Sequence, residues 1–171
     1  IFSALKQDTW VDYIFRVVSI GGLALPTFWV GTLTILFLTI WFDWSPPLGY
    51  TDLTENFWIN VQQLIWPALV LGYYLSAIIS RMTRSAMLEV LRDDYIRTAW
   101  AKGLGLWPIT VRHAFRNAIL PVITISSVQF GTLLGGTVIM ETIFTLPGVG
   151  RYLVDAIFHR DYPVVQTIVM M

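Results

Sequence analysis

Three long runs of residues without formal charge limit the folds that are open to this chain. The first run extends from Val17 to Phe42, the second from Ile59 to Ser80 and the third from Ala118 to Met140. A helix over the first run would measure about 39 Å, which exceeds a hydrocarbon core of about 30 Å. We therefore predict complete membrane spans over residues 17–42, 59–80 and 118–140, and the beginning of a fourth span from residue 163 onward.

Composition supports a membrane protein. Hydrophobic residues make up 56% of the 171 residues and charged residues only 13%, against about 25% charged in soluble domains. Cysteine is absent, which excludes disulfides and thiolate metal sites. The predicted fold is all-α, a polytopic bundle of transmembrane helices. Because no initiator Met is present and the last apolar run is short, we expect a fragment of a longer subunit.

The distribution of basic residues predicts the orientation of the spans. Seven of the eleven Lys and Arg residues lie between Arg81 and Arg116, two lie before Val17, and none lies in residues 43–58. Positive charge accumulates on the cytoplasmic side of membrane proteins. The N-terminal segment and loop 81–117 are therefore predicted to be cytoplasmic, and loops 43–58 and 141–162 to be extracytoplasmic.

Prolines and small residues suggest how the spans are shaped. Pro26 falls inside the first span, where we expect a kink rather than a break, because neighbouring groups in a membrane can replace the lost hydrogen bond. Gly131, Gly135 and Gly136 lie in the third span, and small residues at such density suit close helix packing.

The cytoplasmic loop is predicted to contain a short helix, Asp94 to Leu106. Ala99 and Gly103 are four residues apart and would share one face of that helix, which a partner's surface could approach closely. Arg97 and Lys102 flank this face and could meet acidic groups. The same basic residues would also suit a helix that lies on anionic lipid, and spacing leaves both interpretations open.

A resemblance to a known family favours contact with a partner protein over contact with lipid. The run from Met87 to Gln166, together with PTFWVG from Pro26 and WSPPLGY from Trp44, resembles the permease subunits of ABC importers for di- and oligopeptides, nickel and related solutes. Their cytoplasmic signature is Glu-Ala-Ala, three residues, Gly, nine residues and Ile-x-Leu-Pro. Aligned on Gly103, its first three places hold Arg97, Thr98 and Ala99, and Ala118 to Pro121 close it. The spacing of 14 residues before Ala118 and the missing glutamate both resemble the peptide branch.

The resemblance implies a type I ABC importer permease with no enzymatic activity of its own. It implies multi-pass insertion in the cytoplasmic (inner) membrane of a prokaryote and alternating access driven by partners, which bind the ATP and Mg. The expected partners are a second homologous permease, two ABC ATPases, an extracytoplasmic solute-binding protein and membrane lipid, with no nucleic acid. The residues expected to couple to the ATPase are Asp94, Tyr95, Arg97, Thr98, Ala99, Lys102, Gly103 and Leu104.

Polar residues in and after the third span are candidates for the solute pathway or its gate. Ser126, Ser127 and Gln129 could line the pathway, or could bond neighbouring helices. The segment with Glu141, Pro147, Gly148 and Gly150 resembles a periplasmic gate, and an ordered turn is the alternative interpretation. Glu141 directly follows an uncharged span, so it could be a substrate ligand or, as we favour, a hydrogen-bonded structural carboxylate.

Two other function classes fit less well. A channel or secondary carrier would need charged or unwound elements within the spans, and the three runs carry no charge. An intramembrane hydrolase would need a catalytic dyad or metal ligands, but the two histidines, His113 and His159, are far apart and neither has a second ligand at helical spacing. The solute and the identity of the second permease are left open by the sequence.

Overall fold

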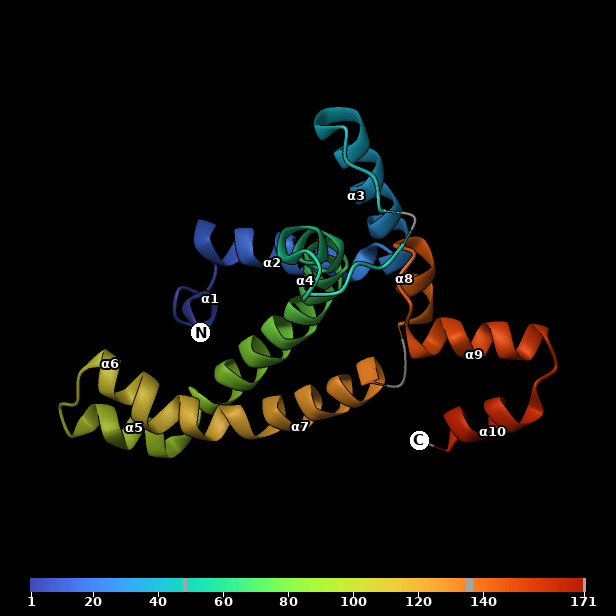
Figure 1. Cartoon of the computed structure of the whole chain (residues 1–171). Helices are drawn as coiled ribbons and strands as arrows, with labels where there is room; N and C mark the ends of the chain where they lie inside the picture. Colours follow the sequence, from blue (N-terminus) through green and yellow to red (C-terminus); the bar gives the residue numbers. More distant parts are fainter. Residues whose placement is uncertain (48, 135–136, 171) are drawn as a thin grey trace. The chain divides into compact units, whose positions relative to one another are not determined.

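The computed structural model describes residues 1–47, 49–134 and 137–170, and these residues form helices and connecting turns without any strand (Figure 1). The predicted all-α fold class is confirmed. The helices, in chain order, are α1 (Phe2–Leu5), α2 (Trp10–Ala24), α3 (Thr27–Phe42), α4 (Phe57–Val90), α5 (Asp94–Ala101), α6 (Leu106–Pro108), the π-helix η1 (Ile109–Ala114), α7 (Phe115–Leu134), α8 (Val138–Ile143), α9 (Val149–Phe158) and α10 (Tyr162–Val169).

The chain divides into two compact units. Unit 1 contains residues 1–24 and 74–130, and unit 2 contains residues 25–73 and 131–171. Helices α4 and α7 each contribute one part to unit 1 and the other part to unit 2. The predicted coupling residues therefore belong to unit 1, and the predicted gate residues around Glu141 belong to unit 2.

The first predicted span is not one kinked helix. Helix α2 ends at Ala24 and α3 begins at Thr27, with Pro26 as its N-cap in an extended conformation, φ −60° and ψ 137°. Proline disfavours helical geometry in the residue before it and cannot donate a backbone hydrogen bond. The prediction of a kink was wrong, because Pro26 starts a new helix instead of bending an existing one.

The second predicted span lies inside a much longer helix. Helix α4 has 34 residues, and the segment from Arg81 to Val90, which was predicted to open the cytoplasmic loop, continues it without interruption. That segment contains neither Gly nor Pro and consists mainly of good helix formers. The charged residues of this segment were interpreted as the beginning of a loop. Charged residues can continue a helix readily where the helix has left the hydrocarbon core of the membrane.

Length and composition qualify one described helix, α4, to cross a bilayer alone. Helices α2 and α3 meet the same criteria only when they are taken together across the break at Pro26. The third predicted span is also divided, since α7 ends at Leu134 and Thr137, before α8, is not helical. Gly135 and Gly136 lie outside the described residues, and the number and topology of the spans stay predictions.

The core of unit 1 joins α4, α5, η1 and α7. Met87, Ile96 and Ile109 are completely buried, and they pack with Ala99, with Ala114 at the end of η1 and with Ala118 in α7. Small residues on η1 and α7 allow these helices to approach the end of α4 closely. The part of unit 1 formed by the end of α4, α5, η1 and the beginning of α7 is thus well packed, whereas the sequence predicted a loop there.

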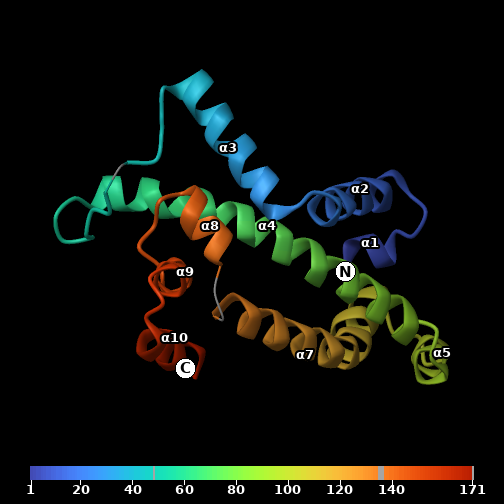
Figure 2. The same ribbon diagram turned by 90° about the vertical axis from the view of Figure 1, so that its right-hand side faces the viewer.

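The core of unit 2 is smaller and joins α3, α4 and α8. Val70, Met140 and Phe144 are buried, with Trp66 and Val30 packed against them. Gly31 on α3 permits this contact, because a Cβ there would lie 3.3 Å from the side chain of Met140. Helix α9 contacts both α8 and α10, as Figure 2 shows.

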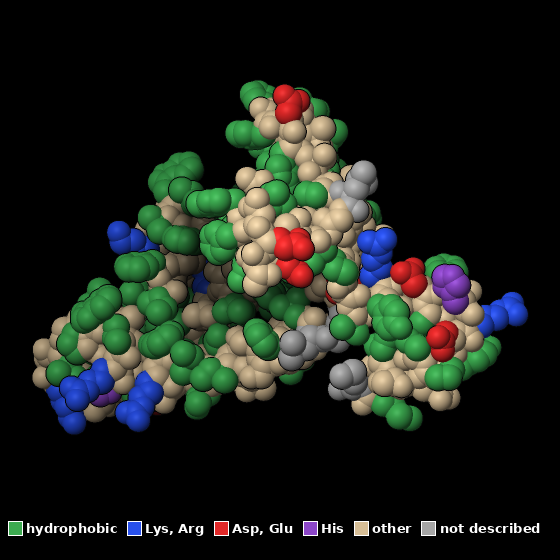
Figure 3. Space-filling view, viewed as in Figure 1, with side chains coloured by type: hydrophobic (Ala, Val, Ile, Leu, Met, Phe, Trp, Pro, Cys, Tyr) green, Lys and Arg blue, Asp and Glu red, His purple; other side chains and the backbone are tan. Residues whose placement is uncertain are grey.

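Large apolar side chains are exposed on many of the helices, and Figure 3 shows them over the face in view. On α3, which is apolar on every face, the outward side chains include Leu36, Phe37, Ile40 and Trp41. Soluble monomers rarely expose contiguous apolar area on this scale. The pattern fits helices that face lipid or partner subunits.

Candidate functional site

The predicted coupling helix is shorter than expected and ends in a Schellman motif. Helix α5 stops at Ala101, and Gly103 takes the left-handed conformation with φ +78°. The N–H of Gly103 donates to the Trp100 carbonyl at 2.9 Å, and the N–H of Leu104 donates to the Ala99 carbonyl at 3.4 Å. These are the two bonds that define this C-terminal cap, for which glycine is favoured at the left-handed position.

The expected small-residue face is therefore wrong in two respects. Gly103 lies beyond the end of α5, so it cannot share a helical face with Ala99. Ala99 is buried, with 7% of its surface exposed, and packs into the core of unit 1 beside Ile96. Residue spacing reveals which positions share a face, but it does not reveal which side of the helix its own chain covers.

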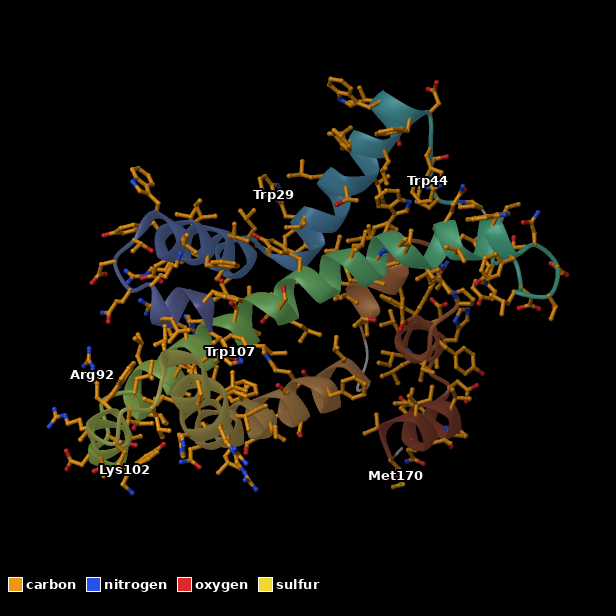
Figure 4. The ribbon with its side chains drawn as sticks, turned by 90° about the vertical axis from the view of Figure 1, so that its left-hand side faces the viewer. Trp29, Trp44, Arg92, Lys102, Trp107 and Met170 are labelled. Atoms are coloured by element: carbon orange, nitrogen blue, oxygen red, sulfur yellow. The ribbon has the colours of Figure 1, made fainter. Side chains whose placement is uncertain are left out.

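A different surface of this end is open. Trp100, Leu104, Leu106 and Trp107 are all exposed, and Trp107 retains 65% of its accessible surface. Arg97, Thr98 and Lys102 are also exposed beside them. Figure 3 shows Lys and Arg side chains gathered over this end of unit 1, and Figure 4 labels Lys102 and Trp107 there. We call Arg97, Trp100, Lys102, Leu104, Leu106 and Trp107 the tip surface.

The other predicted coupling residues have partners within unit 1. Asp94 lies 3.3 Å from Arg97, but both side chains are so exposed that the pair contributes little stability. The hydroxyl of Tyr95 donates to the His113 carbonyl at 3.4 Å and accepts from Asn117 Nδ2 at 2.8 Å. Tyr95 therefore links α5 to the junction of η1 and α7.

Of the 14 residues between Gly103 and Ala118, Leu104 and Gly105 connect α5 to α6, and the other twelve form α6, η1 and the first turn of α7. The η1 segment is π-helical, a rare geometry that is often found at functional sites. Its Thr110 is completely buried, and the hydroxyl donates to the Leu106 carbonyl at 2.7 Å. The longer spacing, relative to the family signature, therefore contains a segment whose buried residues pack in the core of unit 1 next to the tip surface.

Sequence reasoning missed a buried ion cluster in unit 1. Asp12 on α2 is fully buried and accepts from Arg84 Nε and Nη2 on α4, both at 2.8 Å. Arg16 Nη2 donates to it at 2.6 Å, and the Ser3 hydroxyl also donates. Arg84 holds the pKa of Asp12 far below its usual value, even though burial acts in the opposite direction.

Only part of that cluster leaves a signal in the sequence. Asp12 and Arg16 are four residues apart, a spacing that predicts an ion pair on one helix. Arg84 lies 72 residues away, and no local pattern connects it to Asp12. The pairing depends on the packing of α2 against α4, which single-sequence reasoning does not provide.

In unit 2, Glu141 caps the N-terminus of α9. Its Oε2 accepts from the backbone N–H of Arg151, in the first turn, at 2.8 Å. A Cβ on Gly148 would lie only 2.0 Å from the Glu141 carboxyl carbon, and one on Gly150 would lie 2.6 Å from Val138 Cγ2. Both glycines are needed for space, and Glu141 has the hydrogen bond of a structural carboxylate.

A tight turn leads into that cap. Pro147 is exposed, and the N–H of Gly148 donates across it to the Leu146 carbonyl at 3.0 Å. Thr145 donates from its hydroxyl to the Pro47 carbonyl at 3.2 Å. This bond connects two loops, 43–58 and 141–162, that the charge distribution predicts on the same side of the membrane.

The pathway candidates on α7 bond to their own helix. Ser126 donates to the Val122 carbonyl at 2.7 Å and Ser127 to the Ile123 carbonyl at 2.9 Å, each four residues earlier. Gln129 is half-buried. Neither a pathway lining nor a bond between helices is needed to satisfy the two hydroxyls.

Comparison with known proteins places the chain in a family. Residues 1–171 match the model of the binding-protein-dependent transport system inner membrane component. The di/tripeptide transport system permease protein DppB of Pseudomonas aeruginosa is 43% identical over 100% of this chain and 57% of its own length. The dipeptide transport system permease proteins DppB of Haemophilus influenzae and Escherichia coli are 42% and 40% identical over 99% and 97% of this chain, and 56% of each relative.

The chain thus spans somewhat more than half the length of these curated relatives. The matches include both the tip surface and the segment around Glu141. The resemblance predicted from the sequence is confirmed, and the chain belongs to the family of binding-protein-dependent transport system inner membrane components, the helical permeases of ABC importers.

Proposed function

We propose that the chain is part of a permease subunit that moves peptides or related small solutes across the inner membrane by alternating access. Two ABC ATPases would bind and hydrolyse ATP with Mg, a second homologous permease would complete the pathway, and an extracytoplasmic binding protein would deliver the solute. The printed names of the relatives support the peptide class. The subunit itself would catalyse no covalent reaction.

The observation that carries this proposal is the construction of the tip surface. Exposed Trp100, Leu104 and Trp107 are supported from behind by the buried residues Ile96 and Ile109. Aromatic and aliphatic anchors with adjacent arginine and lysine are typical of protein interfaces. A docking surface on a packed body can pass a rigid displacement into α4 and α7, whereas a loose loop would absorb it.

The rival interpretation is that α5 rests on lipid. Tryptophan and basic residues also suit a membrane interface, so composition alone does not separate the two. Anionic lipid and an acidic ATPase groove would both repel acidic replacements, but only docking predicts that the ATPase is lost from the purified complex. The readout must therefore be subunit association as well as transport.

The test is charge reversal in the complete transporter. Arg97→Glu with Lys102→Glu should reduce co-purification of the ATPase at least about tenfold, since two charge-assisted contacts at about 1 kcal/mol each would be lost. ATP-driven uptake should fall in parallel. Arg112→Glu with Arg116→Glu, two exposed changes on η1 and α7 outside the tip surface, is the control matched in charge and should retain both. Full ATPase association in the double variant would refute docking at this surface.

Orientation can be checked independently. A cysteine at Thr98 should react only with membrane-permeant reagents, and one at Thr51 should react with impermeant reagents in cells with an open outer barrier. Labelling of the Thr98 position by an impermeant reagent would overturn the predicted topology and, with it, the proposed coupling.

A further inference from the structure

A cavity of about 770 Å³ lies in unit 1 among α1, α2 and the second half of α4. The tip surface and the Glu141 cap do not use it. Four arginines and four serines contribute to its lining, together with three apolar side chains, Phe15, Ile20 and Leu88. The volume falls within the range of about 300–1,000 Å³ that is usual for small-molecule sites.

The charges in this cavity are unequally compensated. Arg84 and Arg16 are held by Asp12, whose side chain is fully buried, at 2.8 and 2.6 Å. Arg81 and Arg92 form no ion pair within the part of the chain that the structure describes. Glu89 is the one carboxylate among the described lining residues. The cavity therefore holds two fixed guanidinium groups and two without a carboxylate partner.

Most of the polar side chains that line the cavity can donate hydrogen bonds to an anion, and Glu89 is the exception. Guanidinium groups and serine hydroxyls both donate to phosphate oxygens, and arginine does so with two parallel bonds. Ser19 lies on α2, and Ser80 and Ser85 lie on α4, on the two walls that also carry the arginines. This donor set is suited to a phosphate anion more than to a carboxylate, because it offers donors from several directions.

The position of the cavity favours a ligand that has both a charged headgroup and an apolar chain. Its residues 15–20 and 80–92 bracket the predicted cytoplasmic ends of the first two spans, at the level where phospholipid headgroups lie. Phe15, Ile20 and Leu88 provide an apolar wall on which the first methylenes of an acyl chain can rest. Basic pockets between membrane helices on the cytoplasmic side are suited to anionic headgroups.

We propose that this cavity binds the phosphate headgroup of an anionic phospholipid, with Arg81 and Arg92 contacting the phosphate and Arg84 fixed behind it by Asp12. Figure 4 shows Arg92 extending outward at this end of unit 1. The cytoplasmic placement rests on the predicted orientation, whereas the cavity and its donors are features of unit 1 itself.

The experiment measures lipid bound to the full-length subunit in its complete transporter, reconstituted in nanodiscs of phosphatidylcholine with a small fraction of labelled phosphatidylglycerol. Arg81→Gln with Arg92→Gln should weaken phosphatidylglycerol binding about tenfold or more, because two charge-assisted contacts are lost. Arg112→Gln with Arg116→Gln removes the same charge from the same predicted loop, outside the cavity, and should retain wild-type binding. Arg81→Lys with Arg92→Lys should retain most of it.

Other outcomes overturn the proposal. Equal losses in the two glutamine pairs would show only general attraction of a basic loop to the membrane. Inorganic phosphate is the second probe, applied in nanodiscs of phosphatidylcholine alone. If phosphate binds with the same dependence on Arg81 and Arg92 while phosphatidylglycerol does not, the cavity takes a free anion and not a lipid. Binding of neither probe excludes a phosphate site. Co-purification of the partner subunits shows that each variant is folded.

Discussion

Asp12 in unit 1 and Glu141 in unit 2 are both carboxylates with fixed hydrogen-bond donors, but their donors differ in kind and in distance along the chain. Asp12 accepts from Arg84, which is 72 residues away, and from Arg16, and also from the Ser3 hydroxyl and the backbone N–H of Asp8. Glu141 accepts from a backbone N–H ten residues later, in a turn whose glycines leave room for it. The first carboxylate holds distant helices together, and the second completes one local motif.

This difference determines how each site fails. Removing the charge of Asp12 takes from Arg84 the carboxylate that it pairs with and leaves Arg16 with only the exposed Asp8. Loss of a buried counterion is far more costly than loss of an exposed pair. Displacing Glu141 exposes one helix terminus, whose N–H groups water can partly satisfy. We therefore expect the largest effect at Asp12, a smaller one around Glu141 and the smallest at the Gly103 cap.

Asp12→Asn should destabilise the subunit more than Gly148→Ala or Gly103→Ala. The amide nitrogen would face Arg84 or Arg16 as a second donor, and the bidentate ion pair would be lost. Thermal unfolding of the full-length subunit in its complex measures the effect. Asp8→Asn is the control, because Asp8 is 65% exposed and lies 3.2 Å from Arg16. Equal unfolding temperatures for the two variants would contradict a structural role for the cluster.

The pH dependence of stability should report on the same cluster around Asp12. The pKa of Asp12 is lowered in the folded state, so its contribution to stability is fully present above the ordinary carboxyl value of about 4 and is lost as pH falls below it. Wild-type unfolding temperature should lose this contribution below about pH 4, and the part attributable to Asp12 should be missing in Asp12→Asn. Parallel pH profiles for both proteins would count against the ion cluster.

Gly148→Ala should cost about 2–4 kcal/mol, the sum of a lost N-cap and local overpacking. The new Cβ would overlap the Glu141 carboxylate and push it away from the Arg151 N–H. Amide hydrogen exchange of residues 149–158 should rise. Gly72→Ala in α4, where a Cβ meets nothing within 4 Å, is the control within unit 2.

A double-mutant cycle sharpens this prediction. Once Glu141→Ala has removed the carboxylate, Gly148→Ala should cost much less, since the group it would strike is gone. Additive effects would mean that Gly148 is required for its backbone conformation and not for the space that Glu141 occupies.

Gly103→Ala should cost about 1–2 kcal/mol, because φ is +78° and any L side chain is strained there. A Cβ on Gly103 has open space, so the strain does not depend on side-chain size. Gly103→Asn should cost less, since asparagine tolerates this conformation. Unfolding temperature of the full-length subunit is the measurement, and a cost that rises steeply from Ala to Trp would show that the site is crowded.

The same substitutions distinguish two roles for Gly103, as a helix cap and as a position that the docked ATPase approaches closely. We expect Gly103→Trp to abolish ATP-driven uptake while the subunit stays inserted, because the indole would project at the tip surface. Gly103→Ala, with equal strain and no bulk, should retain uptake. Equal loss of uptake in both variants would mean that Gly103 serves only the conformation of the cap.

The sequence was sufficient for features that are local. The helical fold class followed from the uncharged runs, and a hydrogen-bonded carboxylate at Glu141 from its place directly after an uncharged span. The family came from a resemblance that covers most of the chain. Pro26 is also a local signal for a helix break. A kink was predicted there instead, because prolines are tolerated within membrane helices. The burial of Ala99 and the pairing of Asp12 with Arg84 depend on which helices pack together, and one sequence carries no pattern for that.

Site-specific crosslinking at the tip surface tests the central claim most directly. A photoreactive residue at Leu104, in the full-length subunit within intact cells, should crosslink to the partner ATPase, and the yield should change when ATP is depleted. The same residue at Thr51, predicted outside, should not capture the ATPase. Capture of lipid alone at Leu104, or capture of the ATPase at Thr51, would contradict a coupling role for the tip surface.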